Sequence, residues 1–174
     1  MLMKKIAIIS DTHSFLDPKI IKWIKDCDEI WHAGDFGYSN SIKIFIQNYK
    51  VRGVYGNIDG QEIRKTYLKI AKFQCENIKV LITHIGGYPK KYNAEIEKEI
   101  KKYKPDLYIC GHSHILKIMY DNHYNLLHIN PGAAGKEGFH RKRTIVLLKI
   151  DGKKIFDLHV VELGNKSKSI ESYR

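Results

Sequence analysis

Cysteine is scarce in this sequence, and long apolar runs are missing. The three cysteines, Cys27, Cys75 and Cys110, are far apart and form no CxxC pair, so we expect reduced thiols rather than a disulfide framework or a zinc knuckle. The apolar run near the first residue ends after four residues, at Ser10-Asp11, which is too short for the hydrophobic region of a signal peptide. No stretch approaches the roughly 20 apolar residues of a membrane-spanning helix. The sequence therefore predicts a cytoplasmic protein without a membrane partner.

Acidic residues are also few, since 19 Asp and Glu stand against 30 Lys and Arg, for a formal net charge of +11. The cations are spread along the chain and form no block, whereas a nucleic-acid footprint requires clustering. Nucleic acid is therefore not expected as the main partner. A positive field would still steer an anionic substrate toward a binding site.

The length and composition are typical of a soluble globular protein. The chain has 174 residues, of which 43% are hydrophobic, enough for a substantial core. No internal repeat and no linker divides it. We expect one domain over residues 1–164, followed by a polar segment over residues 165–174 that has no apolar period and frays.

The hydrophobic periodicity predicts an α/β protein. In the first half, strands expected at 5–10, 29–33 and 50–55 alternate with helices expected at 18–27 and 39–49. Further along, we expect strands at 67–70, 77–83 and 106–110 and a helix at 94–103. The last third is predicted to be antiparallel strand, at 117–120, 125–130, 144–150 and 154–163. Two packed sheets with helices outside fit this order.

Polar motifs stand at the ends of the expected strands. They are Asp11-Thr12-His13, Gly34-Asp35, Gly56-Asn57-Ile58-Asp59, Thr83-His84 and Gly111-His112-Ser113-His114. Each motif alone has an ordinary explanation as a turn or a strand-to-loop transition. Apart from Asp59, they supply two carboxylates, four imidazoles and one amide, which is a ligand set for two adjacent divalent metals. Two metals in one open site usually indicate phosphate ester chemistry.

The spacing suggests how the ligands divide. Asp11 and His13 lie on one tight turn and would bind a first metal, to which His114 can return. Asp35 is the natural bridge, because each carboxylate oxygen can take one metal. The amide and the remaining two imidazoles, from Asn57, His84 and His112, would complete a second metal. With a bridging hydroxide, such a site keeps about one net positive charge and can hold an anionic ester.

This order of motifs resembles the calcineurin-like metallophosphoesterase superfamily. The short length and Asn130-Pro131-Gly132 resemble its compact YfcE-type phosphodiesterase branch. The resemblance runs from Lys5 to about Leu163 and implies a four-layer α/β/β/α sandwich of two mixed sheets. It also implies a metal-dependent phosphodiesterase in which a hydroxide on the two metals, bridged by Asp35, attacks a phosphate diester.

The resemblance carries over a ligand set and a choice of metals. One metal would be held by Asp11, His13, Asp35 and His114, and the other by Asp35, Asn57, His84 and His112. Mn²⁺ is expected first, with Ni²⁺, Fe²⁺, Zn²⁺ or Co²⁺ as alternatives, because the donors mix nitrogen and oxygen.

The chain departs from the family pattern in three places. Many relatives have a histidine after the Gly-Asn pair that protonates the leaving group, and here that position is Ile58. No side chain is therefore assigned as the catalytic acid, and esters with good leaving groups are expected as substrates. Ala133 stands where relatives frequently have serine, and the loop from Gly86 to Tyr92 is expected to shape the pocket differently.

Alternatives remain open for the substrate contacts and for the function. Asn57 and Arg141 are expected to contact substrate, although Arg141 also fits a solvated basic turn. His32 is expected to be a structural neighbour of the site, and His128 and His159 are not expected to be ligands. The alternative functions are a small-molecule phosphomonoesterase and a catalytically weak protein-binding scaffold. Analogy with the family leaves a homodimer open.

Overall fold

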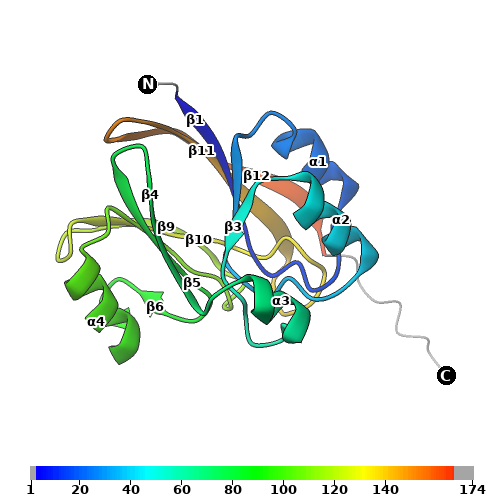
Figure 1. The fold of residues 1–174 in the computed structure, drawn as a ribbon, viewed down its shortest axis with the longest axis horizontal. Coiled ribbons are helices and arrows are strands. Elements are labelled where there is room, and N and C mark those ends of the chain that lie inside the picture. Colours follow the sequence, from blue (N-terminus) through cyan, green and yellow to red (C-terminus); the bar gives the residue numbers. More distant parts are fainter. Residues whose placement is uncertain (1–2, 167–174) are drawn as a thin grey trace.

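The architecture is a sandwich of two sheets with helices on both outer faces (Figure 1). It is taken from a computed structural model that describes residues 3–166. Within that range the helices are α1 (Pro18–Ile24), α2 (Asn40–Asn48), α3 (Gln61–Thr66) and α4 (Ala94–Tyr103). The predicted four-layer α/β/β/α fold of two mixed sheets is confirmed.

The first sheet has the strand order β12-β11-β1-β2-β3. Its parallel half is β1 (Lys4–Ile9), β2 (Glu29–His32) and β3 (Val51–Gly53), in agreement with the expected alternation of strand and helix. Its antiparallel half is β11 (Lys142–Asp151) and β12 (Lys154–Asn165).

The second sheet has the order β4-β5-β8-β10-β9. The strands β5 (Ile78–Thr83), β8 (Leu107–Ile109) and β10 (Leu126–Pro131) are parallel to one another. Antiparallel edges are formed by β4 (Ile70–Cys75) and β9 (Leu116–Asp121). A small hairpin of β6 (Gly87–Tyr88) and β7 (Lys91–Tyr92) follows β5.

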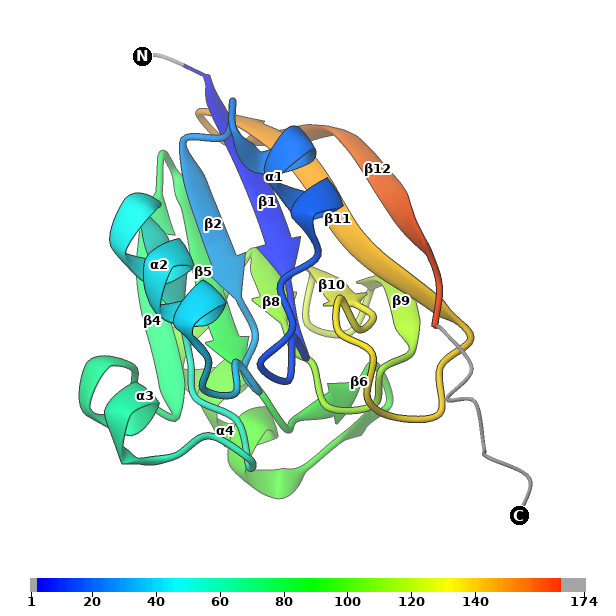
Figure 2. The same cartoon turned by 90° about the vertical axis from the view of Figure 1, so that its right-hand side faces the viewer.

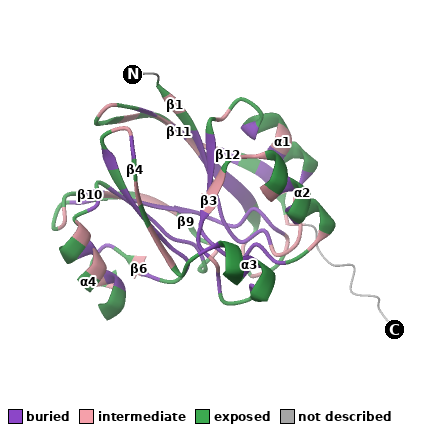
Figure 3. Ribbon diagram, viewed as in Figure 1, coloured by how far each residue is buried: buried purple, intermediate pink, exposed green. Residues whose placement is uncertain are grey.

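Alternation along β1 explains how the layers hold together. Ile6 and Ile8 point into the core between the sheets, where they meet Trp31 and residues of β5, β8 and β10. Ala7 and Ile9 point to the opposite face, which α1 and α2 cover. Both faces of the strand are buried (Figure 3), which is why its sequence is a continuous apolar run.

Local capping signals set the helix starts. Asp17 accepts a hydrogen bond from the backbone N–H of Lys19 at 2.9 Å, and Pro18 occupies the first turn of α1. Asn93 caps α4 by accepting from the N–H of Ile96 at 2.8 Å. The apolar side of α4, Ile96 and Ile100, then packs on the second sheet.

The strand expected at 67–70 is wrong. Residues 67–69 contribute only an isolated bridge between Val54 and Leu68, and the real strand β4 begins at Ile70. The helix α3 before it was not predicted, because it is short and buries only Ile63. At the other end of the chain, β12 continues to Asn165, one residue into the segment expected to fray, and residues 167–174 lie outside the described residues.

The carboxyl ends of the parallel strands of both sheets meet at one edge of the sandwich (Figure 2). Backbone hydrogen bonds join the loops there, from Asp11 N–H to the Gly34 carbonyl and from Gly111 N–H to the His84 carbonyl, both at 3.0 Å. All five polar motifs of the sequence lie in these loops. Among the described residues, no helix is long and apolar enough to cross a membrane.

Candidate metal centre

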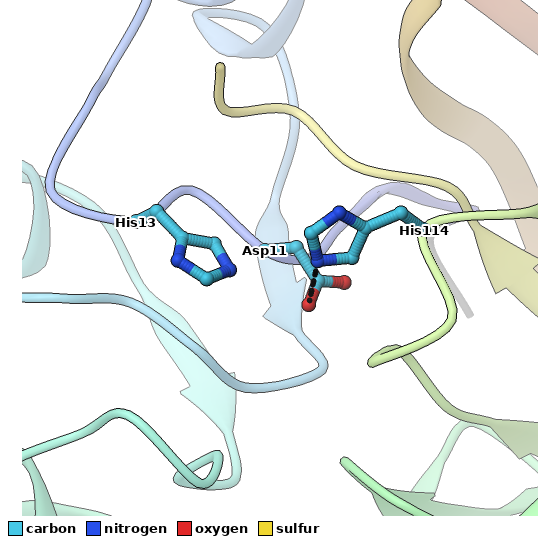
Figure 4. A group of neighbouring side chains, drawn as sticks. All are labelled: Asp11, His13 and His114. Carbon is cyan, nitrogen blue, oxygen red and sulfur yellow. Dashed lines mark ion pairs between the residues drawn. The ribbon is translucent and has the colours of Figure 1, made fainter. Parts of the chain in front are cut away.

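Six of the predicted ligands form two triads at this edge. Asp11, His13 and His114 make one triad (Figure 4), and Asp35, His84 and His112 make the other. Within each triad the potential ligand atoms lie within 4.8 Å of one another. In the first triad Nε2 of His114 is 3.1 Å from Oδ1 of Asp11. Each triad thus combines one carboxylate with two imidazoles, a donor set suited to a transition metal.

Asp35 connects the two triads. Its Oδ2 lies 3.2 Å from Nε2 of His84 and 3.5 Å from Nε2 of His13. Its Oδ1 accepts a hydrogen bond from the backbone N–H of Ile58 at 3.0 Å. Burial by itself raises the pKa of Asp35, but the hydrogen bonds and the charges of the neighbouring histidines lower it overall. The carboxylate is therefore ionised and has one oxygen directed between the two groups.

His84 is held in the tautomer that a metal ligand needs. Its Nδ1 donates to the carbonyl oxygen of Ala33 at 2.8 Å, so that in the neutral ring the lone pair lies on Nε2. That Nε2 lies 3.1 Å from Oδ1 of Asn57, the seventh predicted ligand. Hydrogen bonding of this kind fixes the ring orientation of metal-bound histidines and increases their basicity.

Five of the seven predicted ligands have left-handed backbone conformations. The φ angles are +54° at Asp11, +45° at His13, +56° at Asp35, +67° at His112 and +57° at His114. Such conformations are uncommon outside glycine and cost about 1–2 kcal/mol each for most residues. Their concentration at one place is typical of a functional site, where the surrounding structure enforces strained backbone.

Glycines next to the ligands allow the loops to approach closely. A Cβ at Gly34 would lie 2.6 Å from Nδ1 of His84, and one at Gly56 would overlap the Asp35 carboxylate. The glycines of the Gly-Asp and Gly-Asn pairs therefore allow close packing against two ligands of the second triad, His84 and Asp35. Asp59 closes the same loop, because its carboxylate accepts from the N–H groups of Gly56 at 2.7 Å and Gly37 at 2.8 Å.

A buried network orients the loop that contains Asp11 and His13. Nδ1 of His32 accepts from the N–H of Gly34 at 3.2 Å, and its Nε2 lies 3.1 Å from Oγ1 of Thr12. The Thr12 hydroxyl donates in turn to the carbonyl of Phe36 at 2.9 Å. Burial lowers the pKa of His32 to about 3, so its ring is neutral. The ring connects Gly34 to Thr12 through its two nitrogens. Sequence reasoning identified His32 as a neighbour of the site but missed Thr12.

Asn130 has the same role for the loop that contains His112 and His114. Its Nδ2 donates to the Gly111 carbonyl at 2.9 Å and to Oγ of Ser113 at 3.1 Å, and its Oδ1 accepts from Gly132 N–H at 3.0 Å. The sequence contained a signal for this residue, namely an amide at a strand end directly before Pro-Gly. In the sequence alone this pattern indicated only the branch of the family.

Two unsatisfied atoms of the first triad fit a bound cation. Oδ1 of Asp11 and Nε2 of His13 are buried and have no hydrogen-bond partner among the described residues. Buried polar atoms are normally paired, so two such atoms within the same triad require an explanation. Divalent ions supply one, because each of these atoms is a lone-pair donor.

The remaining predicted site residues lie at the periphery. Ile58 is 45% exposed and directly follows Asn57. Ala133 is fully buried behind the site. Arg141 is exposed, and its side chain makes no hydrogen bond or ion pair within residues 3–166. Its contact with substrate stays a prediction.

Comparison with known proteins agrees with this geometry. The family model of the calcineurin-like phosphoesterase superfamily domain matches residues 3–153. The chain therefore belongs to the calcineurin-like phosphoesterase superfamily, whose fold implies divalent metals. No protein with a curated description matches it.

Solved structures share the fold over nearly the whole chain. A protein described as a novel archaeal phosphodiesterase is 25% identical, with a TM-score of 0.72 over 91% of this chain and 99% of that one. An uncharacterised predicted phosphoesterase from Streptococcus pneumoniae is 18% identical, with a TM-score of 0.66 over 93% and 99%. Zinc-complexed Vps29 from Entamoeba histolytica is 14% identical, with a TM-score of 0.69 over 94% and 99%.

Proposed function

We propose that this protein hydrolyses small phosphate diesters with two divalent metal ions, of which Mn²⁺ is the first expected. The observation that carries the proposal is Asp35, whose Oδ2 lies within 3.5 Å of an imidazole nitrogen from each triad. Asp11, His13 and His114 would hold one ion, Asn57, His84 and His112 the other, and Asp35 both. When bound, two such ions lower the pKa of a shared water and neutralise charge on the phosphate.

The protein's own groups prepare the site for an anionic ester. Oδ2 of Asp11 accepts the backbone N–H of His112 at 3.2 Å, and Oδ1 of Asp35 accepts that of Ile58. In each carboxylate one oxygen therefore accepts a backbone hydrogen bond that ties two loops together, and the other oxygen accepts none. Two carboxylates against two divalent ions leave the centre positive, which favours binding of a phosphate.

The leaving alcohol has no proton donor at position 58, because isoleucine replaces the histidine of many relatives. General acid catalysis commonly contributes about 10²–10⁴-fold to the rate. The proposed substrates are therefore diesters whose alcohol leaves without prior protonation. The similarity to an archaeal phosphodiesterase supports diesters over monoesters.

The test uses protein stripped with chelator and reloaded with Mn²⁺. We expect reloaded protein to hydrolyse bis(4-nitrophenyl) phosphate faster than 4-nitrophenyl phosphate, and stripped protein to hydrolyse neither. Faster cleavage of the monoester would instead favour the phosphomonoesterase. If neither phosphate ester is hydrolysed while metal is bound, the proposal that the protein is a phosphoesterase is refuted.

A protein-binding scaffold is the second candidate. Large apolar side chains next to predicted ligands are exposed, namely Ile58, Ile85 and Ile115, and exposed apolar groups can mark an interaction site. The likeness to Vps29, a vacuolar protein sorting protein, supports the same candidate. Metal binding without hydrolysis of any phosphate ester would favour it. The homodimer and the cytoplasmic location stay predictions.

A further inference from the structure

A cavity of about 270 Å³ opens beside the metal centre, next to His112. Its other side chains are mainly apolar and come from the loops after β5 and β8 and from β9 and β10. The lining includes Ile85, Tyr88, Ile115, Lys117 and His128. Small-molecule pockets are commonly about 300–1,000 Å³, so this volume suits a single ring system rather than a whole dinucleotide.

Two isoleucines line the cavity, and each directly follows a predicted metal ligand in the sequence. Ile85 directly follows His84 and is 47% exposed, and Ile115 directly follows His114 and is 63% exposed. A ring that lay between them would bury apolar surface of both side chains that is now exposed to water. Burial of apolar surface is favourable in proportion to its area, so a large apolar substituent on a bound phosphate would bind more tightly here than a methyl group.

The wall formed by Ile85 is fixed in place. The carbonyl of Ile85 accepts from Nδ2 of Asn93 at 3.2 Å, and the carbonyl of Gly86 accepts from the backbone N–H of Asn93 at 3.1 Å. Gly86 is packed so tightly that a Cβ would overlap the hydroxyl of Tyr108. The cavity is therefore part of the folded structure and does not depend on a mobile loop to form it.

The floor of the cavity contains an unsatisfied imidazole. His128 is 1% exposed, and neither ring nitrogen has a hydrogen-bond partner in the described part of the chain. Burial lowers the pKa of His128 to about 4, so the ring is neutral and has one N–H donor and one acceptor. Leaving such a buried group unpaired is unfavourable. A ligand that reached it would recover that hydrogen bond.

A positive charge stands at the side of the same cavity. Nζ of Lys117 lies 3.7 Å from the centroid of the Tyr88 ring. It makes no ion pair within residues 3–166. This cation disfavours a positively charged substituent, so the occupant is a neutral or anionic group.

Building on the proposed function, we infer that this cavity binds one ester arm of the substrate, a planar aromatic ring with a hydrogen-bonding group at its far edge. The ring packs between Ile85 and Ile115, and its edge reaches the imidazole of His128. The phosphate then lies on the His112 side, toward the metals. The cavity thus selects diesters by their organic arm, which the metal centre alone does not do.

Phosphonates test this pocket without turnover. The probes are 4-carbamoylphenylphosphonate, phenylphosphonate and methylphosphonate, titrated calorimetrically into Mn²⁺-loaded protein. We expect phenylphosphonate to bind at least tenfold more tightly than methylphosphonate, and the carbamoyl group to add about another tenfold.

His128→Phe should remove only the gain from the carbamoyl group, because the phenyl ring of the new residue keeps the floor apolar. Ile115→Ala should reduce the preference for phenyl over methyl, whereas the matched control Ile44→Ala on α2 should change neither.

The outcomes separate the pocket from the activity. Equal binding of phenyl- and methylphosphonate, or a carbamoyl gain that survives in His128→Phe, would overturn the pocket even if diesters are hydrolysed. The expected binding order without hydrolysis of any diester would support the pocket and refute the proposed enzyme. No binding of any phosphonate would overturn the pocket, and the hydrolysis assay with the two aryl phosphates would still decide the activity.

Discussion

Oδ2 of Asp35 lies 3.2 Å from Nε2 of His84, although the two residues follow strands of different sheets. Asp35 comes after β2 in the first sheet, and His84 comes after β5 in the second. Their contact therefore depends on how the sheets pack, which the apolar core of β1, β2, β5, β8 and β10 determines. The candidate metal centre is a product of the whole sandwich.

Replacement of Asp35 should disable the centre. In Asp35→Asn one oxygen becomes an amide nitrogen, which cannot bind a cation, so metal content and diesterase activity should both fall. We expect kcat/KM to decrease by at least about 10²-fold, since charge stabilisation by metals contributes several kcal/mol. The matched control is Asp26→Asn on the exposed surface. Equal activity in the two variants would contradict a shared ligand.

The missing acid at position 58 predicts a strong dependence on the leaving group. Across a series of aryl and alkyl diesters, log kcat/KM should fall steadily as the pKa of the leaving alcohol rises, because the alcohol departs unprotonated. Ile58→His should flatten this dependence by supplying a donor. A rate independent of the alcohol pKa in the unchanged protein would rule out the interpretation.

Two glycines in the same half of the chain should respond differently to alanine. Gly86→Ala would place a Cβ against the Tyr108 hydroxyl, whereas a Cβ at Gly60 meets nothing within 4 Å. We expect Gly86→Ala to lower the free energy of unfolding by about 1–3 kcal/mol and Gly60→Ala to change it by less than about 0.5 kcal/mol. Urea unfolding of the two variants measures both values.

Buried His128 predicts that acid destabilises the metal-free protein. Its pKa is lowered to about 4 by burial, with a smaller contribution from Lys117, whereas the unfolded chain has the ordinary value near 6.5. The unfolded state therefore binds the proton first, and stability is lost as the pH falls from about 6.5 toward 4. This group contributes about 3 kcal/mol across that window.

Chelator-treated protein and His128→Phe, unfolded in urea at several pH values, measure this contribution. The variant should show a smaller loss of stability between pH 6.5 and 4, and buried His32 should supply part of the slope that remains. An identical slope in both proteins would show that His128 is not neutral and buried.

Arg141 and Arg143 should separate substrate binding from stability. Arg143 is buried, with Nη1 2.5 Å from Oδ2 of Asp17, so Arg143→Ala should cost about 3–5 kcal/mol by leaving a buried charge unpaired. Arg141→Ala should leave the melting temperature unchanged and raise KM for the diester severalfold. An unchanged KM would assign Arg141 to a solvated turn.

The features that could be predicted from the sequence are those that follow from the apolar pattern and from the order of the motifs. Buried strands such as β1 and β5 are continuous apolar runs, and helix α4 was predicted with its observed ends because Asn93 and Pro105 frame it. The loops of all seven predicted ligands meet because parallel strands end at one edge. Chain order was therefore enough to bring these residues together.

Other features depend on contacts between segments far apart in the chain. The left-handed φ angles at Asp11 and His112 arise from packing of one loop against another and have no local sequence signal. The half-exposed strand β4 and the short helix α3 have too few buried residues to show a period. His128 looked like an ordinary strand residue, since only the packed sheet reveals that its ring nitrogens lack partners.

The most direct test of the two-metal centre is anomalous scattering at the manganese edge from crystals of the Mn²⁺-reloaded protein. We predict two peaks per chain, one beside Asp11, His13 and His114 and one beside His84 and His112, with Asp35 between them. A single peak, or none within coordination distance of Asp35, would contradict it.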